Sequence, residues 1–116
     1  MISYYYFNSI IKIGMSAKNN WELLDEADKN DIWFHLDNYP SCYVIVSFEK
    51  KMKNIDSIIK YASQLCYTYS KNKVPKNKNA VCVCYTKCKN LRKGTTLGEV
   101  QILKKPKRII IDIRDL

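Results

Sequence analysis

Histidine, glycine and proline are scarce in this chain of 116 residues, which contains one histidine, three glycines and three prolines. So few glycines and prolines argue against a loop-dominated protein. The single histidine excludes motifs that need two, such as HExxH, and GxSxG and P-loop motifs are absent as well. No apolar run approaches ~18 residues, so we expect no transmembrane helix, and the start of the chain lacks the positive charge of a secretory signal.

The length and the hydrophobic content predict one domain over residues 1–116. Hydrophobic residues make up 47% of the chain, which is typical of a folded protein rather than a disordered one. A chain of this length can bury one modest core and is too short for two.

Acidic residues are almost absent from residues 71–108, where 12 Lys or Arg residues accompany a single acid, Glu99. The rest of the chain has 8 basic and 10 acidic residues, so the net charge of +9 comes from this one segment. A localised positive field is typical of proteins that bind a phosphate backbone. A lysine-rich surface that only keeps the protein soluble is the alternative.

The five cysteines do not match the pattern of a metal site. Cys82 and Cys84 alternate in an apolar run, and Cys88 follows four residues later. A structural zinc site needs two CxxC-like or Cys/His pairs at a distance, and these are absent. The odd number of cysteines, without a secretory signal, indicates reduced thiols and a cytoplasmic location. We therefore expect no metal, no cofactor and no disulfide.

Seven segments have the alternation, or the β-branched and aromatic content, of strands. They are residues 4–7, 10–14, 32–36, 43–48, 80–85, 100–103 and 109–113. Asn8-Ser9 is a plausible turn pair. Residues 54–70 predict one long helix with an apolar stripe, capped by Asn54. Residues 19–27 predict one or two further helical turns, with Asn20 as the cap.

These elements predict an α+β fold. It consists of a mainly antiparallel sheet of about six to seven strands, with one long amphipathic helix packed on one face. Residues 71–79 are expected to form a lysine-rich loop, and residues 87–98 a cationic connection without a strand.

The motif DIWFH contains Asp31, Ile32, Trp33, Phe34 and His35. In a strand, Asp31, Trp33 and His35 lie on one face, and Phe34 lies on the other face in the core. Trp33 could then stack against a base while His35 bonds to a base or a phosphate. Alternatively both are structural, with Trp33 packed and His35 bonded to Asp31 or to the backbone. A hydrolase built from the Asp–His pair and a thiol such as Cys42 needs an open site that nothing in the sequence marks.

Two basic turns follow the predicted helix. The first contains Lys87, Lys89, Arg92 and Lys93, and the second contains Lys104, Lys105, Lys107 and Arg108. If the strand between them pairs as a meander, the two turns meet at one end of the sheet. Eight cations on one edge would suit a phosphate backbone, and Arg92 could bind a phosphate through two donors. A solvated turn surface is the alternative.

DIWFH, followed by a Ser-x-x-Val strand at residues 41–44, resembles the signature of the NFACT RNA-binding domain. Tyr85-Thr86, NLRK at residues 90–93 and GEV at residues 98–100 extend the resemblance, which covers residues 3–113. The chain is most similar to the stand-alone form of this domain, without the other modules of the large NFACT proteins. The family usually has histidine where Tyr43 stands, so no role that needs a second imidazole is expected.

The resemblance implies a protein that is not an enzyme and binds structured RNA, such as tRNA or rRNA, in translation or ribosome quality control. It implies no cofactor. A second interpretation is a protein-interaction module whose basic edge meets an acidic surface of a ribosomal or quality-control protein. DNA binding is a third, because backbone contacts distinguish the two nucleic acids poorly, whereas the 2′-hydroxyl and unstacked bases identify RNA.

Overall fold

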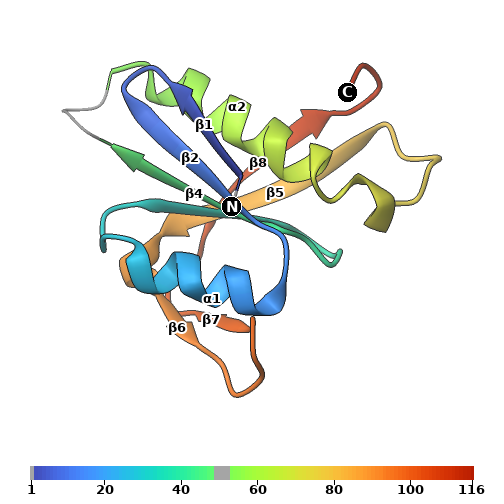
Figure 1. The fold of residues 1–116 in the computed structure, drawn as a ribbon. Helices are drawn as coiled ribbons and strands as arrows, with labels where there is room; N and C mark the ends of the chain where they lie inside the picture. The colour runs from blue at the N-terminus through green and yellow to red at the C-terminus, as the bar shows by residue number, and fades with distance from the viewer. Residues whose placement is uncertain (1, 49–52) are drawn as a thin grey trace.

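A six-stranded antiparallel sheet forms the centre of the computed structural model, which describes residues 2–48 and 53–116 (Figure 1). Its strands are β1 (Ile2–Tyr6), β2 (Ser9–Gly14), β3 (Ile32–Leu36), β4 (Tyr43–Phe48), β5 (Ala80–Lys87) and β8 (Lys107–Asp112). They lie in the order β1-β2-β4-β3-β5-β8, and all neighbours are antiparallel. The predicted α+β class and mainly antiparallel sheet are confirmed.

A two-residue turn joins β1 to β2. Phe7 and Asn8 have φ angles of 47° and 57°, and Tyr6 pairs with Ser9 across the hairpin. Positive φ at both central positions is the geometry of a type I′ turn, whose twist matches that of the paired strands. The turn therefore begins one residue earlier than the predicted Asn8-Ser9.

Helix α2 (Ile55–Thr68) covers one face of the sheet. Its apolar stripe, with Ile58 and Cys66 among its members, is buried in one core with strand residues such as Phe34. The helix is 14 residues long, shorter than predicted. Asn54 precedes it with a left-handed backbone and makes no side-chain cap hydrogen bond, so the prediction that its side chain caps the helix is wrong.

The opposite face of the sheet carries a second helix, α1 (Ala17–Glu26). Ser16 caps this helix, since its Oγ accepts a hydrogen bond of 3.1 Å from the backbone N–H of Asn19. Leu23 is buried with Trp33 in a second core. The prediction of one long helix is therefore wrong, because two helices of moderate length cover the two faces. Within the described ranges, no helix is long and apolar enough to cross a membrane.

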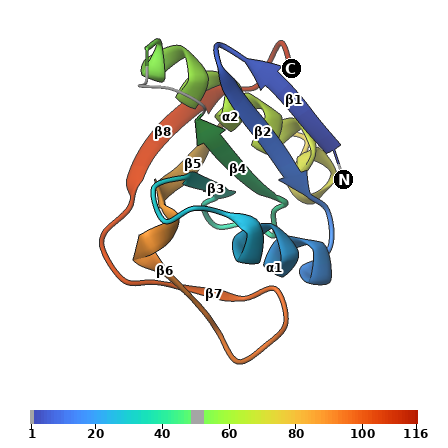
Figure 2. The same ribbon diagram turned by 60° about the vertical axis from the view of Figure 1, so that its left-hand side comes forward.

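A small two-stranded sheet, β6 (Leu91–Lys93) and β7 (Val100–Ile102), lies near α1 (Figure 2). We call residues 91–102 the arm. The predicted connection over 87–98 is wrong, because β5 runs to its end at Lys87 and β6 follows a short 3₁₀ turn. The predicted strand at 100–103 exists, but it pairs with β6 rather than closing the main sheet.

Polar contacts hold the arm to α1 and to the main sheet. They join Trp21 Nε1–H to the Glu99 carbonyl at 3.0 Å, the Tyr43 hydroxyl to the Gly98 carbonyl, and the Lys93 ammonium to the Asp25 carboxylate. The main sheet is therefore covered on one face by α2, and on the other by α1 and the arm.

Candidate nucleic-acid interface

The end of β5 and the start of β8 carry lysines on the face that α2 covers. Val83 and Tyr85 of β5 pack in the α2 core, and the strand alternation places Lys87 on the same face. Lys107 lies opposite Tyr85 in β8, and Lys87 lies opposite Ile32 in β3. Both lysines are exposed, because this end of the sheet lies at the beginning of α2 rather than under its middle.

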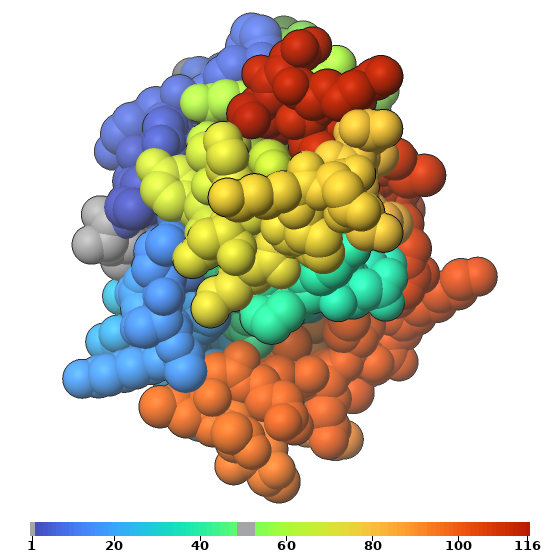
Figure 3. Space-filling view, turned by 90° about the vertical axis from the view of Figure 1, so that its right-hand side faces the viewer, coloured from blue at the N-terminus to red at the C-terminus, as the bar shows by residue number. Residues whose placement is uncertain are grey.

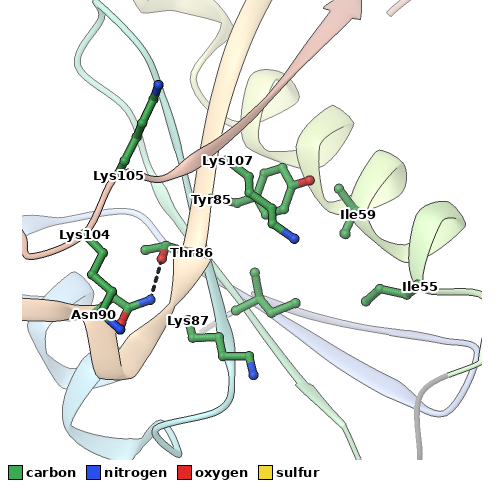
Figure 4. Close-up of a pocket in the computed structure, with 10 residues that line it drawn as sticks. Ile55, Ile59, Tyr85, Thr86, Lys87, Asn90, Lys104, Lys105 and Lys107 are labelled. Atoms are coloured by element: carbon green, nitrogen blue, oxygen red, sulfur yellow. Dashed lines mark hydrogen bonds between the residues drawn. The ribbon is translucent and has the colours of Figure 1, made fainter.

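These lysines line a groove of about 350 Å³ between the beginning of α2 and the ends of β5 and β8 (Figure 4). Its lining consists of Ile32, Ile55, Ile59, Tyr85, Thr86, Lys87, Asn90, Lys104, Lys105 and Lys107. We call it the lysine groove. Four of these ten residues are lysines and none is acidic, so the groove concentrates positive charge where an anion can approach.

The inner surface of the lysine groove is largely apolar. Ile55 and Ile59 come from the first turns of α2, and the Tyr85 ring stacks on Phe34, with ring centroids 5.4 Å apart. One polar contact lies beside this surface, where Asn90 Nδ2–H donates to Thr86 Oγ1 at 2.9 Å (Figure 4). The groove therefore offers cationic groups at its rim and apolar groups inside.

The structure brings together four of the eight predicted cations and places the other four elsewhere. Arg92 donates to Gln101 Oε1 at 2.8 Å, within the arm. Lys93 pairs with Asp25, and its Nζ lies 5.0 Å from the centroid of the Trp21 ring. Lys89 and Arg108 do not line the groove either. The two basic turns therefore meet in part, through Lys87 and the lysines of the second turn.

Arg108 points to the sheet face opposite Lys107, and it forms an ion pair there. Its Nε lies 2.6 Å from Asp37 Oδ2. Burial alone would raise the pKa of Asp37, but the hydrogen bond and charge of Arg108 lower that pKa below its usual 3.8. Arg108 is therefore occupied by a carboxylate and is less available to a phosphate.

The lysine-rich loop of residues 71–78 lies at the other end of α2. A helix of 14 residues is roughly 20 Å long, so the loop and the lysine groove are separated by about that distance. Figure 3 shows the loop, in yellow, beside the C-terminal segment in red. Lys71 Nζ donates to the Leu116 carbonyl at 3.2 Å. The loop therefore does not extend the groove.

The DIWFH motif is packed rather than presented to solvent. Trp33 is 2% exposed and Phe34 is fully buried, on opposite faces of β3. The Asp31 carboxylate accepts hydrogen bonds from Ser47 Oγ at 2.8 Å and from the Asp28 backbone N–H at 2.9 Å. Of the two interpretations of Trp33, burial favours the packed residue and contradicts a stacking platform.

His35 bonds to the backbone and not to Asp31. Its ring stacks on Trp33 at 5.5 Å, and Nδ1 lies 2.7 Å from the Leu36 carbonyl, which can only accept, so Nδ1 carries the proton. Burial lowers the pKa of His35 below its usual 6.5. Burial, with the Glu99 carboxylate nearby, raises the pKa of Tyr43 to about 12. Both rings are therefore neutral at pH 7.

A second cavity, of about 560 Å³, lies between the motif and the arm. His35 and Tyr43 line it from the main sheet, and Gly98, Glu99 and Val100 line it from the arm. The motif residues are thus divided between two cavities: His35 and residues 98–100 line this one, whereas Ile32, Tyr85, Thr86 and Asn90 line the lysine groove.

The thiols form no catalytic pair with His35. Cys42 is buried in the α2 core, whereas His35 lies on the other face of the sheet, so Cys42 cannot pair with His35; the thiol opposite His35 in the ladder is that of Cys84. Burial, with the charges of Asp37 and Asp31 respectively, raises the pKa of Cys84 and of Cys88 to about 12. Such thiols stay protonated at pH 7, whereas the thiolate is the metal ligand and nucleophile.

Metal-ligating side chains are not clustered in the part of the chain that the structure describes: no three His, Cys, Asp or Glu residues there are placed to hold one ion. The expectation of no metal and no cofactor stays a prediction.

Several groove residues were missed by the sequence analysis. Ile55 and Ile59 had been assigned only to the predicted helix, and Tyr85 and Asn90 only to family motifs, but all four line the groove. The alternation from Val83 through Tyr85 could have placed Lys87 on the helix face. The contribution of α2 depends on where the helix begins over the sheet, which periodicity does not specify.

The comparisons with known proteins agree with this fold. The family model described as "NFACT protein RNA binding domain" matches residues 4–104. A comparison with curated proteins found no significant match. Among solved structures, the chain is similar to "the C-terminal of the fibronectin/fibrinogen-binding protein from Streptococcus suis", with a TM-score of 0.75 and 24% identity. The similarity covers 92% of this chain but only 42% of the other, and it indicates a shared fold.

Proposed function

The chain belongs to the NFACT RNA-binding domain family, and from this premise we propose that it binds structured RNA, tRNA or rRNA, through the lysine groove. One observation above all supports this site. Lysines from two separate segments, Lys87 and residues 104–107, line one groove, and none of the described residues in its lining is acidic. Compact ammonium groups of this kind bind phosphates as point charges.

We propose that the protein binds RNA without catalysing a reaction on it. The groove supplies no histidine or cysteine, and the histidine of the chain lies on the other face of the sheet, with its Nδ1 bonded to the backbone. The groove lysines can hold an RNA through its phosphates, and binding requires nothing more of them. By family analogy, the setting is translation or ribosome quality control, in the cytoplasm. The resemblance to the stand-alone form of the domain stays a prediction.

Binding assays with four polyanions test this proposal. Electrophoretic shifts are measured with tRNA, duplex RNA, duplex DNA and heparin, at two salt concentrations. We expect tRNA to bind most tightly, since DNA lacks the 2′-hydroxyl, heparin lacks bases, and duplex RNA lacks the unpaired loop bases of tRNA. Added salt should weaken every complex, because phosphate and sulfate contacts release counterions.

The other interpretations predict different results. Equal affinity for duplex DNA and RNA would favour a DNA-binding domain. If none of the nucleic acids binds, the protein-interaction module remains, and an acidic protein surface becomes the expected partner.

A further inference from the structure

The lysine groove contains apolar surface that a phosphate does not need. Ile55 and Ile59 of α2 form one side, and Ile32 and the Tyr85 ring lie beside them. A groove that only held a phosphate backbone would need its cations and polar donors alone. A volume of about 350 Å³ is near the lower end for pockets that hold small organic groups, so there is room for one flat group such as a base.

A free strand edge also lies at the groove. The pairing of β5 with β8 ends at Tyr85 opposite Lys107, whereas its pairing with β3 continues to Lys87 opposite Ile32. Among the described residues, this end of β5 therefore has a strand on one side only. The Asp37 N–H donates to the Cys82 carbonyl and the Cys88 N–H to the Asp31 carbonyl, so even-numbered residues bond toward β3 and Lys87 presents its N–H and C=O to the open edge. One residue is too few for an added peptide strand, but its donor and acceptor suffice for hydrogen bonds to the edge of a base.

The lysines surround this surface instead of lying along one line. Figure 4 shows Lys104 and Lys105 on one side of β5, and Lys87 and Lys107 on the side that faces α2. A chain that crosses the groove can therefore place phosphates on both sides of β5. The ligand that fits has anionic groups on either side of one flat, partly apolar group.

We propose that the lysine groove binds one unpaired nucleotide of an RNA, extruded from the stack. Its base packs against Ile55, Ile59 and the Tyr85 ring, and its flanking phosphates bind the lysines. This inference rests on the proposed function and specifies the RNA feature that is recognised. Unpaired bases are the part of an RNA that side chains reach most readily, whereas a regular duplex keeps its bases stacked inside.

The test compares two RNAs of matched length, a blunt duplex and the same duplex with a single bulged nucleotide. We expect the protein to bind the bulged RNA about tenfold more tightly, within the range for one packed base. Ile55→Gln should remove this preference, measured as the ratio of the affinities for the two RNAs. The matched control is Ile110→Gln, since Ile110 is 74% exposed on β8 and does not line the groove.

A second measurement uses the unchanged protein, so it does not depend on how the Ile55 variant folds. 2-Aminopurine replaces the bulged base in this experiment. Its fluorescence should change as protein is added and reach a plateau when the protein is in excess. Equal affinity for the two RNAs, with no fluorescence change, would overturn the inference and leave RNA binding intact. Absence of binding to both RNAs would overturn the proposed function as well. Tighter binding of an acidic peptide than of either RNA would assign the groove to a protein partner and overturn both.

Discussion

His35 occupies a position that favours its neutral ring. It stacks on Trp33, its Nδ1–H bonds to the Leu36 carbonyl, and burial lowers its pKa below 6.5. The bond to Leu36 and the charge of Asp37 act in the opposite direction but do not outweigh burial. The unfolded chain, whose His35 has a pKa of about 6.5, therefore binds a proton more readily than the folded protein.

This difference predicts that the free energy of unfolding decreases as the pH falls below about 6.5. The stability from the neutral ring is fully present above the unfolded pKa, and is lost progressively until the pH reaches the folded pKa. One proton limits the slope to about 1.4 kcal/mol per pH unit. Urea titrations between pH 5 and pH 7 measure it, in a range where most carboxylates remain ionised.

His35→Gln is the matched control for this titration, because it removes the only titratable imidazole. The slope between pH 5 and pH 7 should then nearly vanish. A variant that keeps the same slope would show that other groups titrate, and would contradict the assignment to His35.

The faces of residues 32–36 could be predicted from the sequence, but the burial of both could not. Alternation alone separates Trp33 and His35 from Phe34. Whether the Trp33 face is covered depends on Leu23 of α1 and on the arm, which pack there only in the tertiary fold. An exposed aromatic platform was therefore a reasonable interpretation of residues 31–35 alone, because the segments that bury Trp33 lie elsewhere in the chain.

The arm is positioned by a close approach of one glycine to α1. Gly98 has a φ of +86°, and a Cβ built there would lie 2.7 Å from the Cβ of Ala17. A Cβ on Gly94 would instead meet the carboxyl end of the Glu99 side chain, which can move away. A side chain is therefore expected to be less tolerated at Gly98 than at Gly94.

We predict that Gly98→Ala destabilises the protein by roughly 1–3 kcal/mol, since the left-handed backbone and the contact with α1 both oppose a side chain. Gly94→Ala is the matched control and should cost less than about 1 kcal/mol. Urea denaturation gives the two values, and hydrogen exchange should show faster opening of the arm only for the Gly98 variant. Equal costs for the two variants would mean that the arm is not held by this contact.

Elements with a long apolar pattern could be predicted, and short or polar ones could not. The stripe from Ile55 onward identified α2, because 14 residues contain several repeats of the pattern. β6 has three residues, too few for alternation to be recognised, so residues 91–93 were assigned to a loop. In α1 only Asn20 and Leu23 are buried, which leaves little apolar signal in the sequence.

The twelve cations of residues 71–108 are divided among three places. Four line the lysine groove at the beginning of α2, four lie in the lysine loop of residues 71–78 beyond its end, and the other four lie outside both. The sequence showed the basic segment but not this division, because it arises from the length and placement of a helix. Because the groove and the loop are separate, two variants that each lose two lysines can be compared, one changed in the groove and the other only in the loop.

The salt dependence of tRNA affinity separates the two regions most directly. If each of the four groove lysines neutralises one phosphate, the slope of log K against log salt should be about −2.8 to −3.6. Lys87→Ala with Lys107→Ala should make this slope shallower by about 1.4–1.8 and weaken binding at least about tenfold. Lys76→Ala with Lys78→Ala removes the same charge from the loop and should leave the slope nearly unchanged. The opposite pattern, with binding and slope lost in the loop variant and retained in the groove variant, would contradict the assignment of RNA binding to the lysine groove.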